Sequence, residues 1–159
     1  MPYFLYASFP NSRIKPRPST VNAITRQVDV TSQNDAAPEL TLVQAANLNR
    51  TYIILQNLDQ TFDAFYFYAS TQVIDPSVVA TFGVIDQKIW NPVSKILYNK
   101  TDDGTTTNWV AVLPANLTDV GEKIGSYQSA TLESLGDIYA IGTQAALAFL
   151  TLGIDQGRG

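Results

Sequence analysis

Arg50-Thr51-Tyr52-Ile53-Ile54-Leu55-Gln56-Asn57 is the stretch that decides the fold class. This short run of β-branched and aromatic residues, stopped by the polar turn at residues 57–59, is typical of a β-strand. A second run, Ala64-Phe65-Tyr66-Phe67-Tyr68-Ala69, follows after a short polar link, so we expect the two strands to pair antiparallel. Its four adjacent aromatic residues leave both strand faces apolar. One face can pack in the core, and the other needs a second layer or a partner subunit.

Further strand-like runs recur along the chain at intervals of about 8–12 residues, which predicts a β-sandwich or a jelly-roll-like barrel. They cover residues 23–31, 40–43, 95–100, 108–113, 126–132, 138–143 and 148–154. We expect the last two runs to form a closing pair of strands and residues 121–125 to form a turn-rich link. The Asp103-Gly104 turn signal predicts a β-hairpin with an exposed polar tip.

The chain is therefore expected to be all-β and to have three parts. Residues 1–38 are predicted to form an extended arm, because five prolines exclude long helices and the segment lacks the apolar mass for its own core. Residues 39–159 are predicted to form the β-sandwich domain, within which residues 70–119 are an inserted hairpin region.

Two residue types are missing from the sequence, and this limits the chemistry available to it. There is no cysteine, so a disulfide framework, a thiolate nucleophile and a cysteine-based metal site are excluded. There is no histidine, which removes the usual general base at neutral pH and the commonest metal ligand. The sequence also contains no run of about 18 consecutive apolar residues, which a transmembrane helix would require. We expect no enzyme activity, no cofactor, no metal, no small-molecule substrate and no membrane partner.

Charge is distributed unevenly along the chain. The first 28 residues contain four basic and no acidic residues, whereas the remainder contains six basic and fourteen acidic residues. A basic arm on an acidic body favours docking onto an acidic protein surface; nucleic acid is not expected, because there is no run of lysine or arginine. The arm is also rich in aromatic residues, unlike a disordered tail. The partner-binding residues predicted in the arm are Tyr3, Phe4, Tyr6, Phe9, Arg13, Lys15, Arg17 and Arg26.

Two segments resemble small virion proteins of tailed bacteriophages. Residues 50–57 resemble their R-x-Y-L-L-I-Q-N strand, and Gly136-Asp137-Ile138-Tyr139-Ala140-Ile141 resembles their late G-x-I-Y-A-I segment. The resemblance covers residues 48–69 and 120–155, about half of the chain. This sequence departs from that pattern by carrying about 50 residues where such proteins have a few residues and a proline-glycine turn. Residues 97–109 of this insertion resemble the L-Y-x-K-x-D-D-G-x-x-T-N-W hairpin of phage fibre and head-surface proteins.

The resemblance implies a β-sandwich virion component, often trimeric, of the capsid decoration, cement or head-fibre type. We therefore expect a homotrimer that binds the major capsid protein on the capsid surface through its arm and that is made in the bacterial cytoplasm. The alternative is a tail or head-fibre module whose hairpin binds a host glycan. The hairpin residues considered for recognition are Tyr98, Asp102, Asp103, Asn108 and Trp109.

Two other readings of these hairpin residues stay open from the sequence. Trp109 and Tyr98 can stack on a sugar, although packing across the hairpin is the more common role of such aromatics. Asp102 and Asp103 offer oxygen ligands for calcium, but the loop lacks the spacing of a calcium-binding hand, which favours a solvated turn.

Overall fold

The structure, a computed structural model, describes residues 21–143 and 147–156, with side chains from residue 27 to residue 143. Its strands form three four-stranded sheets and one two-stranded ribbon, which confirms the predicted all-β class and is consistent with a sandwich. The helical elements in these ranges are η2 (Pro114–Asn116) and α2 (Leu117–Val120). No helix in the described part of the chain is long and apolar enough to span a membrane.

The sandwich consists of two antiparallel sheets that face each other across one core. The outer sheet has the order β1 (Val21–Val30), β14 (Leu147–Gln156), β3 (Arg50–Asn57) and β12 (Ser129–Leu132). The middle sheet has the order β11 (Glu122–Ile124), β4 (Ala64–Tyr68), β13 (Ile138–Gly142) and β2 (Thr41–Gln44). Ile53 and Leu55 of β3 pack with Tyr66 of β4 and Ile138 of β13 in the core between the sheets.

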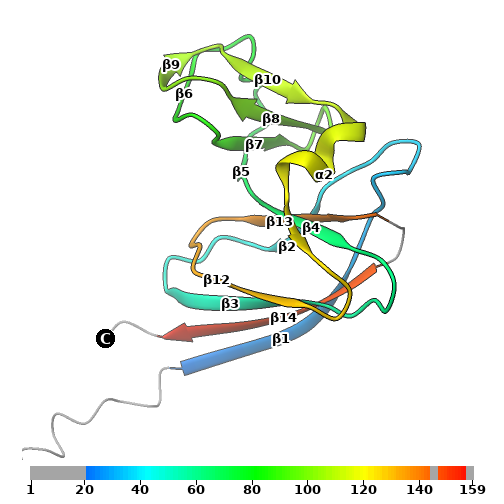
Figure 1. The fold of residues 1–159 in the computed structure, drawn as a ribbon. Helices are drawn as coiled ribbons and strands as arrows, with labels where there is room; N and C mark the ends of the chain where they lie inside the picture. Colours follow the sequence, from blue (N-terminus) through cyan, green and yellow to red (C-terminus); the bar gives the residue numbers. More distant parts are fainter. Residues whose placement is uncertain (1–20, 144–146, 157–159) are drawn as a thin grey trace, which may run out of the picture.

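The predicted insertion forms a third layer on the far side of the middle sheet (Figure 1). Its main sheet has the order β10 (Trp109–Val112), β8 (Ile96–Lys100), β7 (Lys88–Asn91) and β5 (Ser70–Thr71), with β5 parallel to β7. The short ribbon pairs β6 (Thr81–Gly83) with β9 (Gly104–Thr106). The register of β8 with β10 confirms the predicted hairpin.

The two apolar faces of β4 are buried on opposite sides of the middle sheet. Tyr66 faces the sandwich core, whereas Phe67 packs against Trp90 and Leu97 of the third layer. Because a side chain of this size contributes about 2–3 kcal/mol when it is removed from water, this second core holds the insertion against the sandwich. The second layer that the aromatic run requires is therefore supplied by the same chain.

The expected pairing of residues 50–57 with residues 64–69 is wrong. β3 pairs with β12 and β14, and β4 pairs with β11 and β13, so the link at residues 58–63 crosses from one sheet to the other. The expected closing pair is wrong in the same way, since β13 and β14 lie in facing sheets. Alternation of apolar and polar residues shows that one face of a strand is buried. It does not show whether two such strands lie side by side in one sheet or in two sheets that face each other. The predicted link at residues 121–125 contains β11, which pairs with β4.

Residues 21–30, which the sequence assigns to the arm, form a full strand of the outer sheet. β1 pairs with β14 from Val21 opposite Gln156 to Val30 opposite Leu147. Val30 is buried in the sandwich core, and Ser32 forms a bridge to Gly142. In the structure these residues belong to the sandwich, so an arm can extend no further than residue 20. The expected boundary at residue 38 fails because β14 supplies the hydrogen-bonding partner that this alternating segment lacks by itself.

Candidate functional site

The hairpin places Trp109 against the third-layer sheet. Trp109 lies opposite Lys100 in the β8–β10 register, and its indole Nε1 donates a hydrogen bond to the Thr81 carbonyl at 3.2 Å. The Lys100 Nζ lies 5.5 Å from the centre of the indole ring, within the range of a cation–π contact. Both side chains are buried, so this arrangement ties the hairpin to β6 and does not present a surface to a ligand.

The polar residues of the hairpin tip form a closed hydrogen-bond network, the hairpin cluster of Lys100, Asp102, Thr106 and Asn108. The Lys100 ammonium, whose side chain is fully buried, donates to Asp102 Oδ1 at 2.5 Å and to Thr106 Oγ1 at 2.6 Å. Asn108 Nδ2 donates to Asp102 Oδ2 at 2.8 Å. The hydrogen bond from Lys100, followed by that from Asn108, lowers the pKa of Asp102 below its usual value. The cluster therefore neutralises a buried cation at the tip.

The candidate recognition residues of the hairpin are occupied by internal contacts. Tyr98 and Trp109 are each only 3% exposed, so neither offers a ring face on which a sugar could stack. The exposed Asp103 accepts a hydrogen bond from the Ile85 amide at 2.8 Å through Oδ1. In residues 27–143, no group of three or more acidic side chains is arranged to hold a metal ion. Tyr98 and Trp109 therefore serve packing within the hairpin, whereas Asp103 and Asn108 stay exposed.

The predicted arm residues fall largely outside the described part of the chain. Seven of them precede residue 21: Tyr3, Phe4, Tyr6, Phe9, Arg13, Lys15 and Arg17. Arg26 is described as part of β1, where it lies opposite Thr151 of β14. Because the other seven residues lie outside the described part of the chain, their position relative to the hairpin residues stays a prediction.

Both ends of β3 carry a buried polar residue that binds main-chain carbonyls. The Arg50 guanidinium donates to the carbonyls of Ala45, Ser134 and Gly136, with a distance of 2.6 Å to Ser134 O. At the other end, Asn57 Nδ2 donates to the carbonyls of Phe62 at 2.8 Å and Ile124 at 3.2 Å. These contacts join β3 to loops that lead into both sheets. The polar ends of the R-x-Y-I-I-L-Q-N strand are therefore needed by the fold.

An exposed apolar surface lies on the third layer, along residues 73–85, which we call the apolar segment. All seven of its large aliphatic and aromatic side chains are between 48% and 71% exposed. They are Val73, Ile74, Val78, Val79, Phe82, Val84 and Ile85. The segment contains one charged residue, Asp75, whose Oδ1 accepts hydrogen bonds from both the amide and the hydroxyl of Ser77.

The apolar segment is anchored along its length by side chains of the third layer. Asn91 Nδ2 donates to the Val73 carbonyl at 3.1 Å, the Trp109 indole binds the Thr81 carbonyl, and Asp103 binds the Ile85 amide. The ribbon of β6 with β9 fixes its central part. The exposed side chains are therefore presented from a defined backbone, as a preorganised interface requires.

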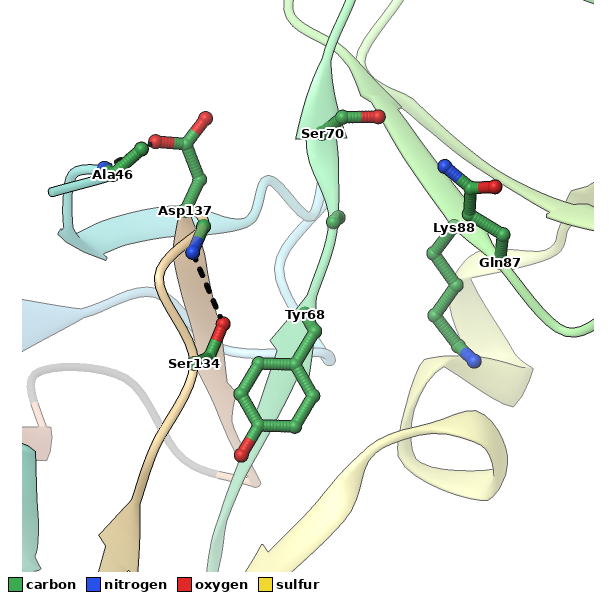
Figure 2. Close-up of a pocket in the computed structure, with 9 residues that line it drawn as sticks. Ala46, Tyr68, Ser70, Gln87, Lys88, Ser134 and Asp137 are labelled. Atoms are coloured by element: carbon green, nitrogen blue, oxygen red, sulfur yellow. Dashed lines mark hydrogen bonds between the residues drawn. The ribbon is translucent and has the colours of Figure 1, made fainter. Parts of the chain in front are cut away.

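Beside the apolar segment, a groove separates β4 and β11 from the chain at residues 84–88. This Tyr68 groove has a volume of about 470 Å³ and is lined by Phe67, Tyr68, Val84, Ile85, Asp86 and Glu122 among others. A smaller hollow of about 320 Å³ adjoins it and shares Tyr68, Gln87 and Lys88. Figure 2 shows Tyr68 in this hollow, with Asp137 and Ser134 on one side of the ring and Gln87 and Lys88 on the other.

The walls of the Tyr68 groove are aromatic and aliphatic, and its rim carries two carboxylates, Asp86 and Glu122, and one ammonium, Lys88. Tyr68 is 43% exposed and meets the Tyr66 ring edge-on, with ring centres 5.7 Å apart. Burial raises the pKa of Tyr68 to about 12, with smaller contributions from Tyr66 and from the Glu122 carboxylate, so its hydroxyl stays protonated at neutral pH. Glu122 lies opposite Tyr66 in the β11–β4 register, and the exposed Asp86 lines the same groove. This surface suits a ligand that is both apolar and cationic.

The apolar segment and the Tyr68 groove were both missed by the sequence analysis. A usable signal was present in the segment, because residues 73–85 are rich in valine and isoleucine, carry a single charge and follow no period of 2 or 3.6. Such a run can form a buried strand or an exposed surface. Its exposure follows from the contacts that hold its main chain on the outside of the third layer, and the sequence does not reveal these contacts. The groove had no signal, since its walls come from segments about 20 to 50 residues apart in the chain.

Comparisons with known proteins add no assignment. No protein-family model matches the chain, and no curated protein matches its sequence. Among solved structures, it is similar to one titled "Bacillus endospore appendages form a novel family of disulfide-linked pili". The likeness has a TM-score of 0.37 and 14% sequence identity, and covers 88% of this chain and 90% of that chain. At this distance it bears on neither the fold nor the function.

Proposed function

We propose that this chain is a non-enzymatic virion structural protein of a tailed bacteriophage, which binds and stabilises the major capsid protein lattice as a trimer on the capsid surface. The strand and hairpin motifs that resemble small phage virion proteins support the virion assignment. The apolar segment is the observation that carries the assembly role. Monomeric proteins rarely leave an apolar surface of this size uncovered.

The summed exposed area of the apolar side chains in the segment is comparable to one side of a protein interface. With exposed fractions between 48% and 71%, its seven large side chains present on the order of 700 Å² to solvent. A stable interface of standard size buries about 800 Å² on each partner. Phe82, at 69% exposure in the middle of β6, is the largest apolar side chain in the segment and its natural hot spot.

The basic, aromatic N-terminal segment supports the same role. Residues 1–20 contain Arg13, Lys15 and Arg17 and no acidic residue, while the remainder of the chain is strongly acidic. Such a segment reaches a neighbouring subunit of the lattice and holds the protein in place, with its charges steering the encounter and its aromatic side chains supplying affinity.

Cosedimentation with expanded capsids that lack this protein tests the proposal. The full-length chain is expected to sediment with the shells at saturating stoichiometry. The double substitution Val78→Asp with Phe82→Asp is expected to weaken binding at least tenfold, because the loss of an interface hot spot costs about 2 kcal/mol or more. Leu48→Asp is the matched control, since Leu48 is 77% exposed but lies in the loop before β3.

The mass of each variant in solution is measured in parallel, so that loss of lattice binding is separated from loss of self-association. The proposal predicts that the Leu48→Asp control binds as tightly as the wild type. Failure of the wild-type protein to bind any form of the capsid, or equal binding by the double variant, would overturn it.

A further inference from the structure

We infer that the Tyr68 groove is the acceptor site for residues 1–20 of a second copy of this chain. The inference deepens the proposed function, on which it rests, by naming the neighbouring subunit that receives the N-terminal segment. The occupant is argued from charge complementarity, from composition and from the position at which the segment joins the body.

The charges of groove and segment are complementary. Glu122 and Asp86 lie on the groove rim together with Lys88, whose ammonium donates to the Asp86 main-chain carbonyl at 3.1 Å. The rim keeps a net charge of −1, and within residues 27–143 neither carboxylate forms an ion pair. Residues 1–20 carry three positive charges and no negative charge. Among the described lysines, Lys95, Lys100 and Lys123 are paired with Glu39, Asp102 and Asp63, whereas Lys88 binds a main-chain carbonyl.

The apolar composition of the segment also matches the groove. Tyr3, Phe4, Tyr6 and Phe9 place four aromatic side chains within the first nine residues of the chain. The groove offers Tyr68, Val84 and Ile85, which are 43%, 50% and 56% exposed. Burial of an aromatic side chain against these walls supplies the apolar part of the affinity, and the arginines then reach the rim carboxylates.

The groove also runs beside an open strand edge. β11 is the edge strand of the middle sheet, and among the described strands only β4 pairs with it. Its first residue, Glu122, lines the groove. Pro10, Pro16 and Pro18 favour an extended backbone in the N-terminal segment, which is the conformation that an added strand requires.

The position of β1 favours a second copy over the same copy. β1 lies in the outer sheet, and the middle sheet lies between it and the third layer, which supplies residues 84–88 of the groove (Figure 1). Twenty extended residues span about 66 Å, which is ample to reach an adjacent copy of a domain whose radius of gyration is roughly 15 Å. Three copies that exchange their segments in a ring form a closed trimer.

Charge reversal on each side of this contact tests the inference in the full-length chain. The groove variant combines Asp86→Asn with Glu122→Lys; asparagine is used at residue 86 because its φ of 67° is tolerated by that side chain. The segment variant combines Arg13→Glu, Lys15→Glu and Arg17→Glu. A control, Asp29→Asn with Glu133→Lys, makes the same charge change at two exposed residues outside the groove.

Sedimentation velocity over a concentration series gives the assembly state of each protein. We expect a trimer for the wild type and the control, and at least a tenfold weaker association for the groove variant and for the segment variant. When these two variants are mixed, the negative segment of one can occupy the reversed groove of the other, so association between unlike variants is expected to return. It is expected as pairs or even-numbered rings, because a ring of three always keeps one contact between like charges. Circular dichroism and urea unfolding confirm that each variant remains folded.

Three results would overturn the inference: a wild-type protein that stays monomeric, groove and segment variants that associate like the wild type, or a mixture that stays dissociated. Capsid cosedimentation of the same variants keeps the two proposals apart. A wild-type protein that binds capsids but shows no groove-dependent association contradicts this inference alone. A protein that associates through the groove but binds no capsid contradicts the proposed function alone.

Discussion

Asn57 at the end of β3 gives a quantitative test of how the two sheets of the sandwich are joined. Its side chain is fully buried, its amide donates to the carbonyls of Phe62 and Ile124, and its Oδ1 accepts from the Asp59 amide at 3.0 Å. Asn57→Ala leaves these three main-chain groups without their partner. Because each unsatisfied group costs about 1–3 kcal/mol and the hydrogen bonds with Phe62 and Asp59 are only partly buried, we expect a loss of about 3 kcal/mol.

Urea unfolding monitored by far-ultraviolet circular dichroism measures this loss. With a denaturant dependence of about 2 kcal/mol per molar, the midpoint should fall by about 1.5 M. Asn57→Asp retains the oxygen that accepts from Asp59 but loses both donations, so it should be destabilised as well. Gln56→Ala, at the adjacent half-buried position, is the control and should shift the stability by less than about 1 kcal/mol. A loss below about 0.5 kcal/mol for Asn57→Ala would refute the reasoning.

Three further perturbations test the third layer. Gly83→Ala should destabilise the protein and change the tryptophan emission, because the added Cβ would lie 2.5 Å from Trp109 Cζ2. Gly104→Ala meets no atom within 4 Å, so it should cost only the backbone strain of its φ of 110°, about 1–2 kcal/mol by urea unfolding, without a change in emission. The lowered pKa of Asp102 means that its contribution to stability is present above the unfolded value near 4 and is lost as pH falls through the folded pKa. Acid titration of the urea midpoint should therefore be flatter below pH 4 in Asp102→Asn than in the wild type, and an unchanged slope would contradict the role of the hairpin cluster.

The strands could be predicted from the sequence more readily than their partners. Alternation and β-branched composition located β3, β4, β8 and β10, and the Asp103-Gly104 turn located the hairpin. The predicted pairing of β3 with β4 was wrong because the two strands lie in opposite sheets and each presents an apolar face to the same core. Local pattern shows which face of a strand is buried, whereas the neighbour depends on contacts distant in sequence.

The aromatic residues of the hairpin illustrate a second limit. Trp109 and Tyr98 have the composition of a recognition surface, but the apolar segment covers them, and their exposure depends on that tertiary contact. The apolar segment itself leaves its valines and isoleucines exposed, although the sequence pattern alone would assign them to a buried strand. The sequence therefore drew attention to the hairpin residues of this layer and not to the apolar segment beside them.

The number of copies of this protein in a purified virion tests the central claim most directly. Quantitative mass spectrometry against the major capsid protein provides it without any substitution. A lattice-binding trimer follows the symmetry of the shell, so the proposed function predicts on the order of hundreds of copies in each particle, in constant ratio to the capsid subunit. About a dozen copies or fewer would instead place the protein at the tail or neck, and its absence from the particle would contradict the account.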